Sequence, residues 1–402
     1  MDIKTSSAAQ PASAPFDIGA EIELEMVSDT GSDAFRQARA EINPTAVAGP
    51  EPAPQAASGT RPISFKNYWY VACRSRELKA NQAIQRTILD EWVALFRDED
   101  GQPVALQDRC PHRNYKLSEG HVRNGLLQCP YHGWTYDKTA QVVAIPSESR
   151  DFKQLKSRCA KKFEAMELDD FIYVRLEKHP EMDDPPFRMP HYGEKGFKTI
   201  RLFNVFQNDV TNCAENYVDV PHTVFVHDKI FRVARDEKVE ATVTRKDGSV
   251  VVEYRNETDN MGWFAWFLNP KKQPIVHRDA FHSPNVTSVE YIFSPGKTFY
   301  ISSHCTPVSD TLTYVYTDLT FQFGIFNAFA GPIVRYQGQS VIDQDIVALN
   351  TQMEVIQKYG VNFSHSRADI VHIFIESLRH AIAKGENPKS LSPQVKDFEF
   401  WI

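Results

Sequence analysis

The sequence has no long apolar run and no excess of basic residues, and each absence excludes a class of protein. Of its 402 residues, 42% are hydrophobic and 24% are charged, which is ordinary for a globular protein. No stretch approaches the roughly 20 apolar residues that span a bilayer. The formal net charge of −7 leaves no basic face for nucleic acid. We therefore expect neither a membrane nor a nucleic-acid partner.

Cysteine is also scarce. Six cysteines occur, and four of them (Cys73, Cys159, Cys213 and Cys305) are scattered without the spacing of a disulfide framework. The first residues lack the basic stretch and apolar core of a secretory signal. These two features predict reduced thiols and a cytoplasmic location.

The composition changes along the chain. Residues 1–60 are poor in aromatic residues and rich in Ala, Pro and Ser, so they are predicted to form a flexible tail. From 62 to 178, short strand-like runs alternate with turn signals such as Asp100-Gly101, which predicts a small all-β domain. A charged, proline-rich linker is expected at 179–195.

Residues 196–402 mix strand and helix patterns. Strand-like runs occur at 239–255, 261–268, 287–293, 298–304 and 311–323, and helical patterns cover 215–219, 335–359 and 367–384. Antiparallel strands around a long helix form an α+β domain with an internal cavity. The predicted fold class is α+β, with a small all-β domain followed by a helix-grip domain.

Two cysteines and two histidines form the strongest chemical signal. Cys110 and His112 have the pattern C-x-H, Cys129 and His132 have the pattern C-x-x-H, and sixteen residues separate the pairs. This spacing suits a Rieske [2Fe–2S] centre, in which two histidines replace two cysteines on one iron. Zinc also binds two cysteines and two histidines, but zinc fingers do not alternate the two residue types. The pattern therefore predicts an iron–sulfur cluster that accepts electrons.

A second group of metal-ligand residues lies downstream. His222 and His227 are five residues apart, which a regular helix would not place on one face, although a turn distorted near Pro221 can bring them together. Two structural histidines are the alternative interpretation. With the cluster motif upstream, the pair favours the two-histidine, one-carboxylate site of non-haem iron enzymes, which leaves coordination positions open.

Helical periodicity separates two candidates for the carboxylate. Ile342, Leu349 and Met353 lie on one apolar stripe of the helix expected at 335–359. Asp345 lies at the edge of this stripe, whereas Asp343 lies further off on the other side. Because an inward carboxylate is costly unless it is paired or binds a metal, Asp345 is predicted to be the ligand and Asp343 to be solvated.

Other polar residues have weaker signals. Asp219 precedes His222 by three residues, so its carboxylate is predicted to accept a hydrogen bond from the imidazole and to fix its tautomer. The alternative for Asp219 is a position on a helix surface. His277, His282 and His304 lie in strand-like runs without ligand spacing and are predicted to be structural or to line a pocket.

With these residues, the chain resembles the Rieske non-haem iron oxygenases of the α-subunit type over roughly residues 64–385. Beyond the cluster motif, two segments carry the resemblance. The pattern E-N-x-x-D-x-x-H-x₄-H is matched by Glu215, Asn216, Asp219, His222 and His227. The pattern Q-D-x₆-Q, further along the chain, is matched by Gln344, Asp345 and Gln352. The single-subunit members that form homotrimers fit best.

Two positions distinguish the chain from respiratory Rieske proteins, and two others depart from the oxygenase pattern. Tyr115 and Tyr131 stand where the Rieske proteins of respiratory complexes have a cysteine pair, which favours the oxygenase and ferredoxin types. Asn114 stands where oxygenases usually have glycine, and asparagine tolerates the positive φ that the loop needs. Asn350 stands where many members have glutamate.

The resemblance implies two metal cofactors. Cys110, His112, Cys129 and His132 would hold one [2Fe–2S] cluster, and His222, His227 and Asp345 would hold one Fe(II) that activates O₂. Asn216 would lie beside the iron and order the incoming ligand. Electrons from NAD(P)H would arrive through a separate flavin-dependent reductase, in some members through a ferredoxin. In the implied homotrimer, His132 of one copy faces Asp219 of the next.

The expected substrate is a small aromatic or heterocyclic molecule, because Phe203, Phe225, Met261 and the aromatic segment 262–267 suggest an apolar pocket. Monooxygenation is favoured by the resemblance, while dioxygenation, demethylation and N-oxygenation remain open. Two other classes of protein fit the sequence less well. An electron-transfer Rieske protein would have no use for a second metal site, and a binding protein with a degenerate site would not keep every expected ligand.

Overall fold

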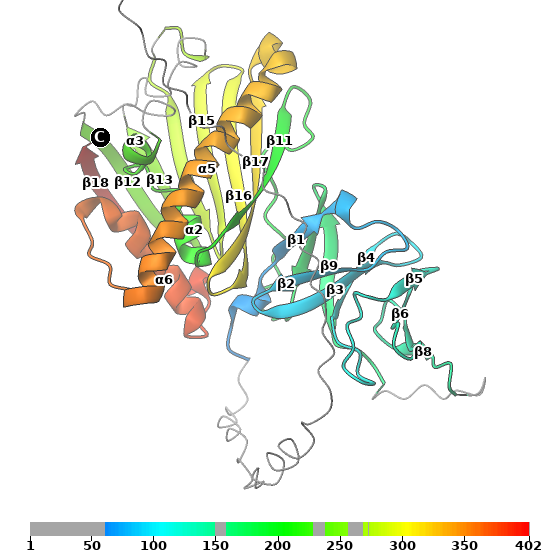
Figure 1. Ribbon diagram of the computed structural model, residues 1–402. Coiled ribbons are helices and arrows are strands. Elements are labelled where there is room, and N and C mark those ends of the chain that lie inside the picture. Colours follow the sequence, from blue (N-terminus) through cyan, green and yellow to red (C-terminus); the bar gives the residue numbers. More distant parts are fainter. Residues whose placement is uncertain (1–60, 149–157, 228–237, 256–267, 272, 402) are drawn as a thin grey trace, which may run out of the picture. The chain divides into compact units, whose positions relative to one another are not determined.

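The computed structural model describes residues 61–401 except 149–157, 228–237, 256–267 and 272 (Figure 1). The described residues fall in one compact unit, Thr60–Ile402. The predicted tail, residues 1–60, and most of the strand predicted at 261–268 lie outside them. No helix of the described part is long and apolar enough to cross a membrane.

The first half of this unit contains strands and only short helical turns. One sheet has six antiparallel strands in the order β1-β10-β9-β4-β3-β2, and a smaller sheet has four in the order β5-β6-β7-β8. Their bounds are β1 (Tyr70–Arg74), β2 (Ile84–Ile88), β3 (Glu91–Arg97), β4 (Pro103–Gln107), β5 (His121–Arg123), β6 (Leu126–Gln128), β7 (Thr135–Tyr136), β8 (Val142–Ala144), β9 (Lys162–Leu168) and β10 (Phe171–Arg175). The predicted all-β character of this part is confirmed.

The hairpin expected at Asp100-Gly101 joins β3 to β4. Asp98 Oδ1 accepts hydrogen bonds from the backbone N–H groups of Asp100 and Gln102 at 2.9 and 2.8 Å, and Gly101 takes a positive φ of 75°. A side chain that satisfies the turn's own backbone and a glycine at positive φ are the chemistry that closes such turns.

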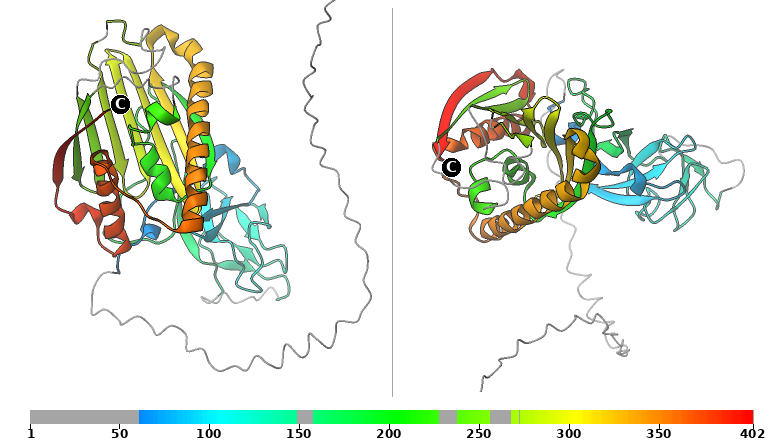
Figure 2. Two further views of the ribbon diagram at one scale, coloured as in Figure 1. Left: turned by 60° about the vertical axis from the view of Figure 1, so that its left-hand side comes forward. Right: turned by 90° about the horizontal axis from the view of Figure 1, so that it is seen from above.

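The second half forms one large antiparallel sheet with helices on one of its faces (Figures 1 and 2). Its eight strands have the order β11-β17-β16-β15-β14-β13-β12-β18. The bounds are β11 (Lys198–Phe206), α2 (Val210–Asn216), α3 (Thr223–Val226), β12 (Lys238–Lys246), β13 (Ser249–Arg255), β14 (Val276–His282), β15 (Val286–Ser294), β16 (Lys297–Ser309), β17 (Leu312–Gln322), α5 (Asn327–Tyr359), α6 (Ile370–Ala383) and β18 (Gln394–Trp401). The α+β fold class with a sheet around a long helix is confirmed.

Several predicted boundaries are wrong. The run at 239–255 is two strands, because Asp247 and Gly248 both take positive φ and close a hairpin. The long helix begins at Asn327, eight residues before the predicted start at 335. The short helix predicted at 215–219 ends at Asn216.

Strands β11 and β18 were not predicted, whereas β14 contains His277 and His282, which were expected in strand-like runs. Most of the outer strand β18 is exposed, so its sequence carries little of the alternation that predicts a strand. It pairs with β12 along the whole of its length, and Phe398 and Phe400 pack against the core.

The predicted linker at 179–195 contains no helix or strand, but part of it is packed. Met182 and Met189 are each only 4% exposed. The Arg175 guanidinium donates a hydrogen bond to the Met182 carbonyl at 2.6 Å. The predicted domain limits, 62–178 and 196–402, stay predictions, since both parts lie in the same compact unit.

Hydrogen bonds join the six-stranded sheet to the eight-stranded sheet. The Thr306 hydroxyl donates to the Val71 carbonyl at 2.8 Å, and the Tyr316 hydroxyl donates to the Ala72 carbonyl at 3.0 Å. All four residues are buried. These buried bonds tie β1 to β16 and β17, on which the cavity described below is built.

Candidate functional site

The two Cys/His loops have the same backbone form. The N–H of Asn114 bonds to the Cys110 carbonyl at 2.8 Å, and the N–H of Gly133 bonds to the Cys129 carbonyl at 3.0 Å. Asn114 and Gly133 take positive φ values of 58° and 73°. The expectation that asparagine keeps the loop shape is therefore confirmed. A Cβ at Gly133 would meet Cγ of Pro146 at 2.6 Å, so this loop also needs glycine for space.

The loops bring the four predicted cluster residues together. Cys110 and Cys129 are each 2% exposed, and the rings of His112 and His132 lie 4.5 Å apart, centroid to centroid. The two sulfurs share one hydrogen bond, which lowers the pKa of the Cys110 thiol, with help from the Tyr136 hydroxyl, and raises the pKa of the Cys129 thiol. The thiolate is the form that binds iron. Two buried sulfurs beside two facing imidazoles fit a Rieske cluster.

Aromatic rings surround the histidine side of these loops. Tyr115 and Tyr131 lie 5.5 Å apart, centroid to centroid, where the respiratory proteins have their cysteine pair. His112 stacks on Trp134 at 4.7 Å with an interplanar angle of 3°. His132 is exposed whereas both cysteines are buried, so the histidine side is the one through which the loops reach the surface.

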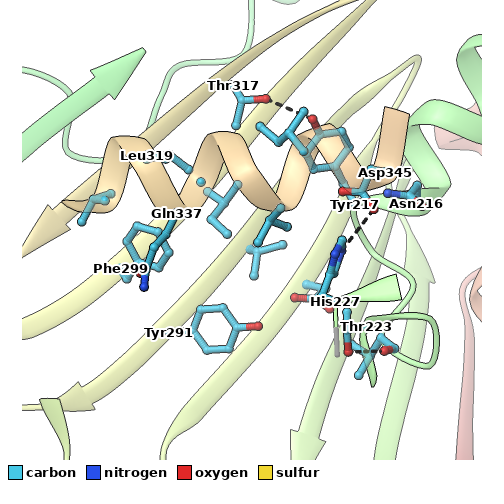
Figure 3. Close-up of a pocket in the computed structure, with 18 of the residues that line it drawn as sticks. Asn216, Tyr217, Thr223, His227, Tyr291, Phe299, Thr317, Leu319, Gln337 and Asp345 are labelled. Carbon is cyan, nitrogen blue, oxygen red and sulfur yellow. Dashed lines mark hydrogen bonds and ion pairs between the residues drawn. The ribbon is translucent and has the colours of Figure 1, made fainter. Parts of the chain in front are cut away.

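The second predicted metal site also assembles. His222 follows Pro221 at the start of α3, His227 ends that helix, and Asp345 extends from α5 toward them (Figure 3). The distances to Asp345 Oδ1 are 3.6 Å from His222 Nε2 and 3.1 Å from His227 Nε2. The irregular chain around Pro221 therefore does bring the two histidines together, as expected from the sequence.

Hydrogen bonds at the other ring nitrogens orient both histidines. His222 Nδ1 lies 3.0 Å from Asp219 Oδ2, and His227 Nδ1 lies 2.9 Å from Gln344 Oε1. Since both partners are acceptors, each Nδ1 carries the proton and each Nε2 keeps a lone pair. Asp345 Oδ1 is buried and accepts no hydrogen bond. Three acceptors thus converge without a donor between them, which is costly unless a cation binds there, and the donor set suits Fe(II).

The pKa shifts at the site also favour a bound cation. Burial alone would lower the pKa of His222, but its hydrogen bond with Asp219 and the nearby Asp345 carboxylate overcome this effect and raise the pKa to about 9. Burial would raise the pKa of Asp345, but the nearby His222 and His227 rings hold it below its usual range. The site therefore favours a positive charge among its ligands.

The helix orientation separates the two aspartates as predicted. Asp345 is 4% exposed, whereas Asp343 is exposed and accepts a hydrogen bond from Gln339 at 2.8 Å. Asn350, where many family members have glutamate, accepts a hydrogen bond from the Gln207 backbone at 2.9 Å. Asn350 therefore anchors the end of β11 to α5.

A cavity of about 170 Å³ opens beside the two histidines and Asp345. Its lining includes Asn216 and Asp219 near the histidines and apolar side chains from the sheet and α5, among them Tyr291, Phe293, Phe299, Leu319, Phe323, Val334 and Ile342 (Figure 3). The expected apolar pocket exists, but two residues predicted to line it do not. Phe225 is 79% exposed, and Phe203 packs on Tyr314 and Tyr316. Residues 261–267 lie outside the described part.

Two acid–histidine pairs, one half-buried and one buried, were not predicted. Glu215 on α2 and His372 on α6 form a short hydrogen bond and line a second cavity of about 370 Å³. Burial raises the pKa of Glu215 to about 7, although His372 lowers it. His277 and Asp279 on β14 form the other pair, at 2.9 Å. The pair of His277 and Asp279 could have been found from the sequence, since the two residues are two apart in a strand-like run and so share one face. Glu215 and His372 are 157 residues apart, so no local sequence pattern indicates that they meet.

Comparison with known proteins agrees with this geometry. Residues 68–164 match the family model described as the Rieske [2Fe-2S] domain, and residues 207–372 match the one described as the vanillate O-demethylase oxygenase C-terminal domain. The first covers both Cys/His loops, and the second covers His222, His227 and Asp345.

Several characterised proteins are similar over part of the chain. The chloroplastic protein TIC 55 of Pisum sativum is 26% identical over 73% of this chain and 53% of its own length. The oxygenase component of dicamba O-demethylase of Stenotrophomonas maltophilia is 32% identical over 46% of this chain and 54% of its own length. The chain thus spans about half the length of the curated relatives it matches.

Solved structures share the fold. Dicamba monooxygenase bound to dicamba superposes with a TM-score of 0.68 at 23% identity, covering 80% of this chain and 99% of that one. NdmA of Pseudomonas putida CBB5 with caffeine superposes with a TM-score of 0.68 at 18% identity, covering 82% of this chain and 96% of that one.

Proposed function

The chain belongs to the Rieske non-haem iron oxygenases, and we propose that it uses electrons from a separate reductase to oxygenate a small aromatic or heterocyclic molecule with O₂, by monooxygenation. One observation carries the proposal. His222, His227 and Asp345 converge, without a proton donor between them, at the wall of an apolar cavity. A group of residues that could hold a metal ion, beside a cavity that could hold a substrate, supports this function.

In this function, seven side chains bind the two metal cofactors. Cys110, His112, Cys129 and His132 hold a [2Fe–2S] cluster, and His222, His227 and Asp345 hold Fe(II). When bound, the cluster supplies single electrons and the Fe(II) supplies the chemistry of O₂ activation.

The remaining residues of the site prepare it for that chemistry. Asp219 and Gln344 keep the Nδ1 protons of the two histidines in place, so that both Nε2 atoms stay available as ligands. Asn216 lies on the cavity wall and orders the incoming ligand. The apolar walls exclude water around the substrate.

We also propose that electrons pass between copies of the chain in a homotrimer. His132 and Asp219 are both exposed, so the carboxylate of one copy can accept a hydrogen bond from His132 of another. Among the described residues of one chain, no hydrogen bond or ion pair joins the Cys/His loops to the three metal-binding residues, which supports a route through a second copy. A flavin-dependent reductase, directly or through a ferredoxin, supplies the electrons from NAD(P)H. The six cysteines are free of disulfides, which favours a reducing compartment such as the cytoplasm.

Iron content and turnover test the main proposal. An oxygenase binds about three iron atoms per chain, whereas a simple electron carrier with one cluster binds about two. The purified protein, supplied with NADH and a surrogate reductase, is expected to insert label from ¹⁸O₂ into members of an aromatic and heterocyclic panel. Two irons per chain with no label in any product would sink the proposal in favour of the carrier.

Demethylation is the second candidate, because a relative that matches this chain is named an O-demethylase. It starts from the same insertion into a C–H bond but releases formaldehyde from a methoxy or N-methyl group. Formaldehyde detection with methylated members of the panel separates it from ring hydroxylation.

Mixing two inactive variants tests the electron route. Cys129→Ser lacks the cluster and keeps the mononuclear site, whereas Asp345→Asn keeps the cluster and lacks that site. Co-assembled from unfolded or dissociated chains, the two are expected to recover part of the wild-type turnover if electrons cross between copies. A mixture that assembles into trimers but stays inactive would show that the route lies within one chain.

A further inference from the structure

The sheet wall of the apolar cavity contains a buried carboxylate that the metal sites do not use. Asp279 lies on β14, lines the cavity and is 2% exposed. Among the described residues that line this cavity, it is the one acidic side chain apart from Asp219 and Asp345. Those two lie beside the histidines on the helical side, whereas Asp279 belongs to the opposite wall.

The carboxylate is held in place from behind. His277 Nε2 donates a hydrogen bond to Asp279 Oδ1 at 2.9 Å. The two residues share the inward face of β14 because side chains alternate along a strand. The His277 ring is stacked between Tyr254 and Tyr291, at centroid distances of 4.2 and 4.3 Å and interplanar angles of 17° and 21°. An imidazole clamped in this way fixes the direction of the carboxylate.

This arrangement leaves Asp279 able to bind a ligand. A carboxylate in an apolar environment is costly unless hydrogen bonds satisfy it, and it has about four acceptor positions. Among the described residues, His277 is the one side-chain partner that donates a hydrogen bond to the Asp279 carboxylate. The neighbours on the cavity wall, Val289 and Ile301, offer no donor. Because Asp279 lines the cavity, a molecule bound there can offer a donor to its remaining acceptor positions.

We propose that Asp279 selects substrates that present an N–H or O–H donor to the sheet wall, such as an amide, lactam, indole or phenol. The carbon to be oxidised then faces the histidines on the opposite wall, while the flat body of the molecule lies between Tyr291 and Phe299. Carboxylate-bearing substrates are disfavoured, because their charge would face that of Asp279. The inference rests on the proposed function in taking this cavity as the substrate site.

Binding of isosteric pairs to the iron-loaded protein tests this selection. The probes are indole against benzofuran, phenol against fluorobenzene, and benzamide against benzoate, each measured by calorimetric titration without reductase. A hydrogen bond to a charged acceptor stabilises by about 1.5–3 kcal/mol, so the donor member of at least one pair is expected to bind roughly 10-fold or more tightly. Equal affinities within the pairs, tighter binding of benzoate, or no binding by any donor member would overturn the inference.

Asp279→Asn locates the effect. The asparagine keeps the shape and can still accept from His277, but it turns an NH₂ group toward the cavity. The donor preference is expected to fall at least tenfold in this variant and to persist in Asp343→Asn, which removes the same charge from the exposed face of α5. An unchanged preference in a folded Asp279→Asn protein would make Asp279 a structural partner of His277 only.

The two proposals fail separately. The wild-type comparison needs no variant, so a misfolded Asp279→Asn protein, recognised by circular dichroism, leaves it standing. Donor selection without turnover would leave Asp279 as a binding residue and contradict the oxygenase function. Equal turnover rates for substrates with and without donors would contradict selection by Asp279 and leave the oxygenase function standing.

Discussion

Asp219 accepts a hydrogen bond from His222 Nδ1 at 3.0 Å while its own side chain stays 46% exposed. The residue thus connects a buried imidazole to the surface. His222 in turn lies 3.6 Å from Asp345, so a change at the surface carboxylate is felt at the metal-binding group. We expect these contacts, from Asp219 through His222 to Asp345, to couple electron delivery to the iron site.

Asp219→Asn is expected to reduce turnover without removing iron. Asparagine cannot reproduce the carboxylate's charge toward His222, or toward His132 in the assembly of copies that we propose, and loss of such an outer partner typically costs 10–100-fold. The measurement is steady-state oxygenation together with the rate at which the pre-reduced cluster is re-oxidised in a single turnover. Asp343→Asn is the control with the same loss of charge on the exposed face of α5. Wild-type rates in Asp219→Asn would exclude the coupling role.

Asp345→Asn is expected to lose the mononuclear iron and to keep the cluster. The amide binds a cation more weakly than the carboxylate, and the two histidines alone do not complete the site. Iron should fall from about three to about two atoms per chain, while the visible spectrum of the cluster stays unchanged. In Asp343→Asn all three should remain. If Asp343→Asn rather than Asp345→Asn lost the third iron, the assignment from helix orientation would be wrong.

Tyr136→Phe is expected to lower the reduction potential of the cluster. The Tyr136 hydroxyl lies 3.1 Å from Cys110 Sγ in a buried environment, and a hydrogen bond to a ligating sulfur stabilises the reduced form. Losing about 1 kcal/mol corresponds to about 40 mV for a one-electron couple. Redox titration followed by electron paramagnetic resonance measures the shift. Tyr131→Phe removes an exposed hydroxyl from the same loops, and an equal shift there would argue against a specific effect of Tyr136.

Glu215 and His372 are expected to make stability fall as the pH rises. Burial raises the pKa of Glu215 from 4.5 to about 7, so the folded state binds more protons than the unfolded state between these values. The pKa of His372 is also raised, first by its hydrogen bond with Glu215, and its stabilisation is likewise lost as pH rises through the folded value. Both groups act in the same direction, Glu215 between its ordinary pKa of 4.5 and about 7 and His372 above its ordinary pKa of 6.5.

Urea unfolding at pH 5, 6, 7 and 8 tests this. Between the lowest and the highest of these pH values, the free energy of unfolding is expected to fall by on the order of 2 kcal/mol more in wild type than in Glu215→Gln. The neutral amide of the variant removes one titrating group and keeps a hydrogen-bond partner for His372. Glu376→Gln changes an exposed acid one turn further along α6 and should follow wild type. Parallel curves for wild type and Glu215→Gln would show that the pair does not titrate as inferred.

Much of the site could be read from local sequence. The spacing of Cys110, His112, Cys129 and His132 predicts the cluster because each pair occupies one short loop, whose geometry depends on a few neighbouring residues. Asn114 could be judged in the same way, since positive φ is a property of one residue. Asp345 was separated from Asp343 by helical periodicity alone, because the apolar stripe of α5 shows which side of the helix is buried.

The cavity wall could not be read in this way. Phe203 and Phe225 are as apolar as Phe293 and Phe299, yet only the latter two line the cavity, because strand pairing and sheet curvature decide which residues of the inward face meet α5. Residues 261–267 were proposed as walls from composition and lie outside the described part, so that prediction stands untested.

The two candidate ligand sets and the α+β class could be predicted from the sequence, because metal-ligand spacing, turn residues and helical periodicity act over a few residues. Which distant groups lie next to one another depends on packing between segments far apart in the chain. Glu215 meets His372 across 157 residues, and Asp279 meets the cavity because β14 lies in the middle of the large sheet, opposite the helices. Burial raises the cost of unpaired charge, so these contacts, set by packing alone, determine what the cavity can bind.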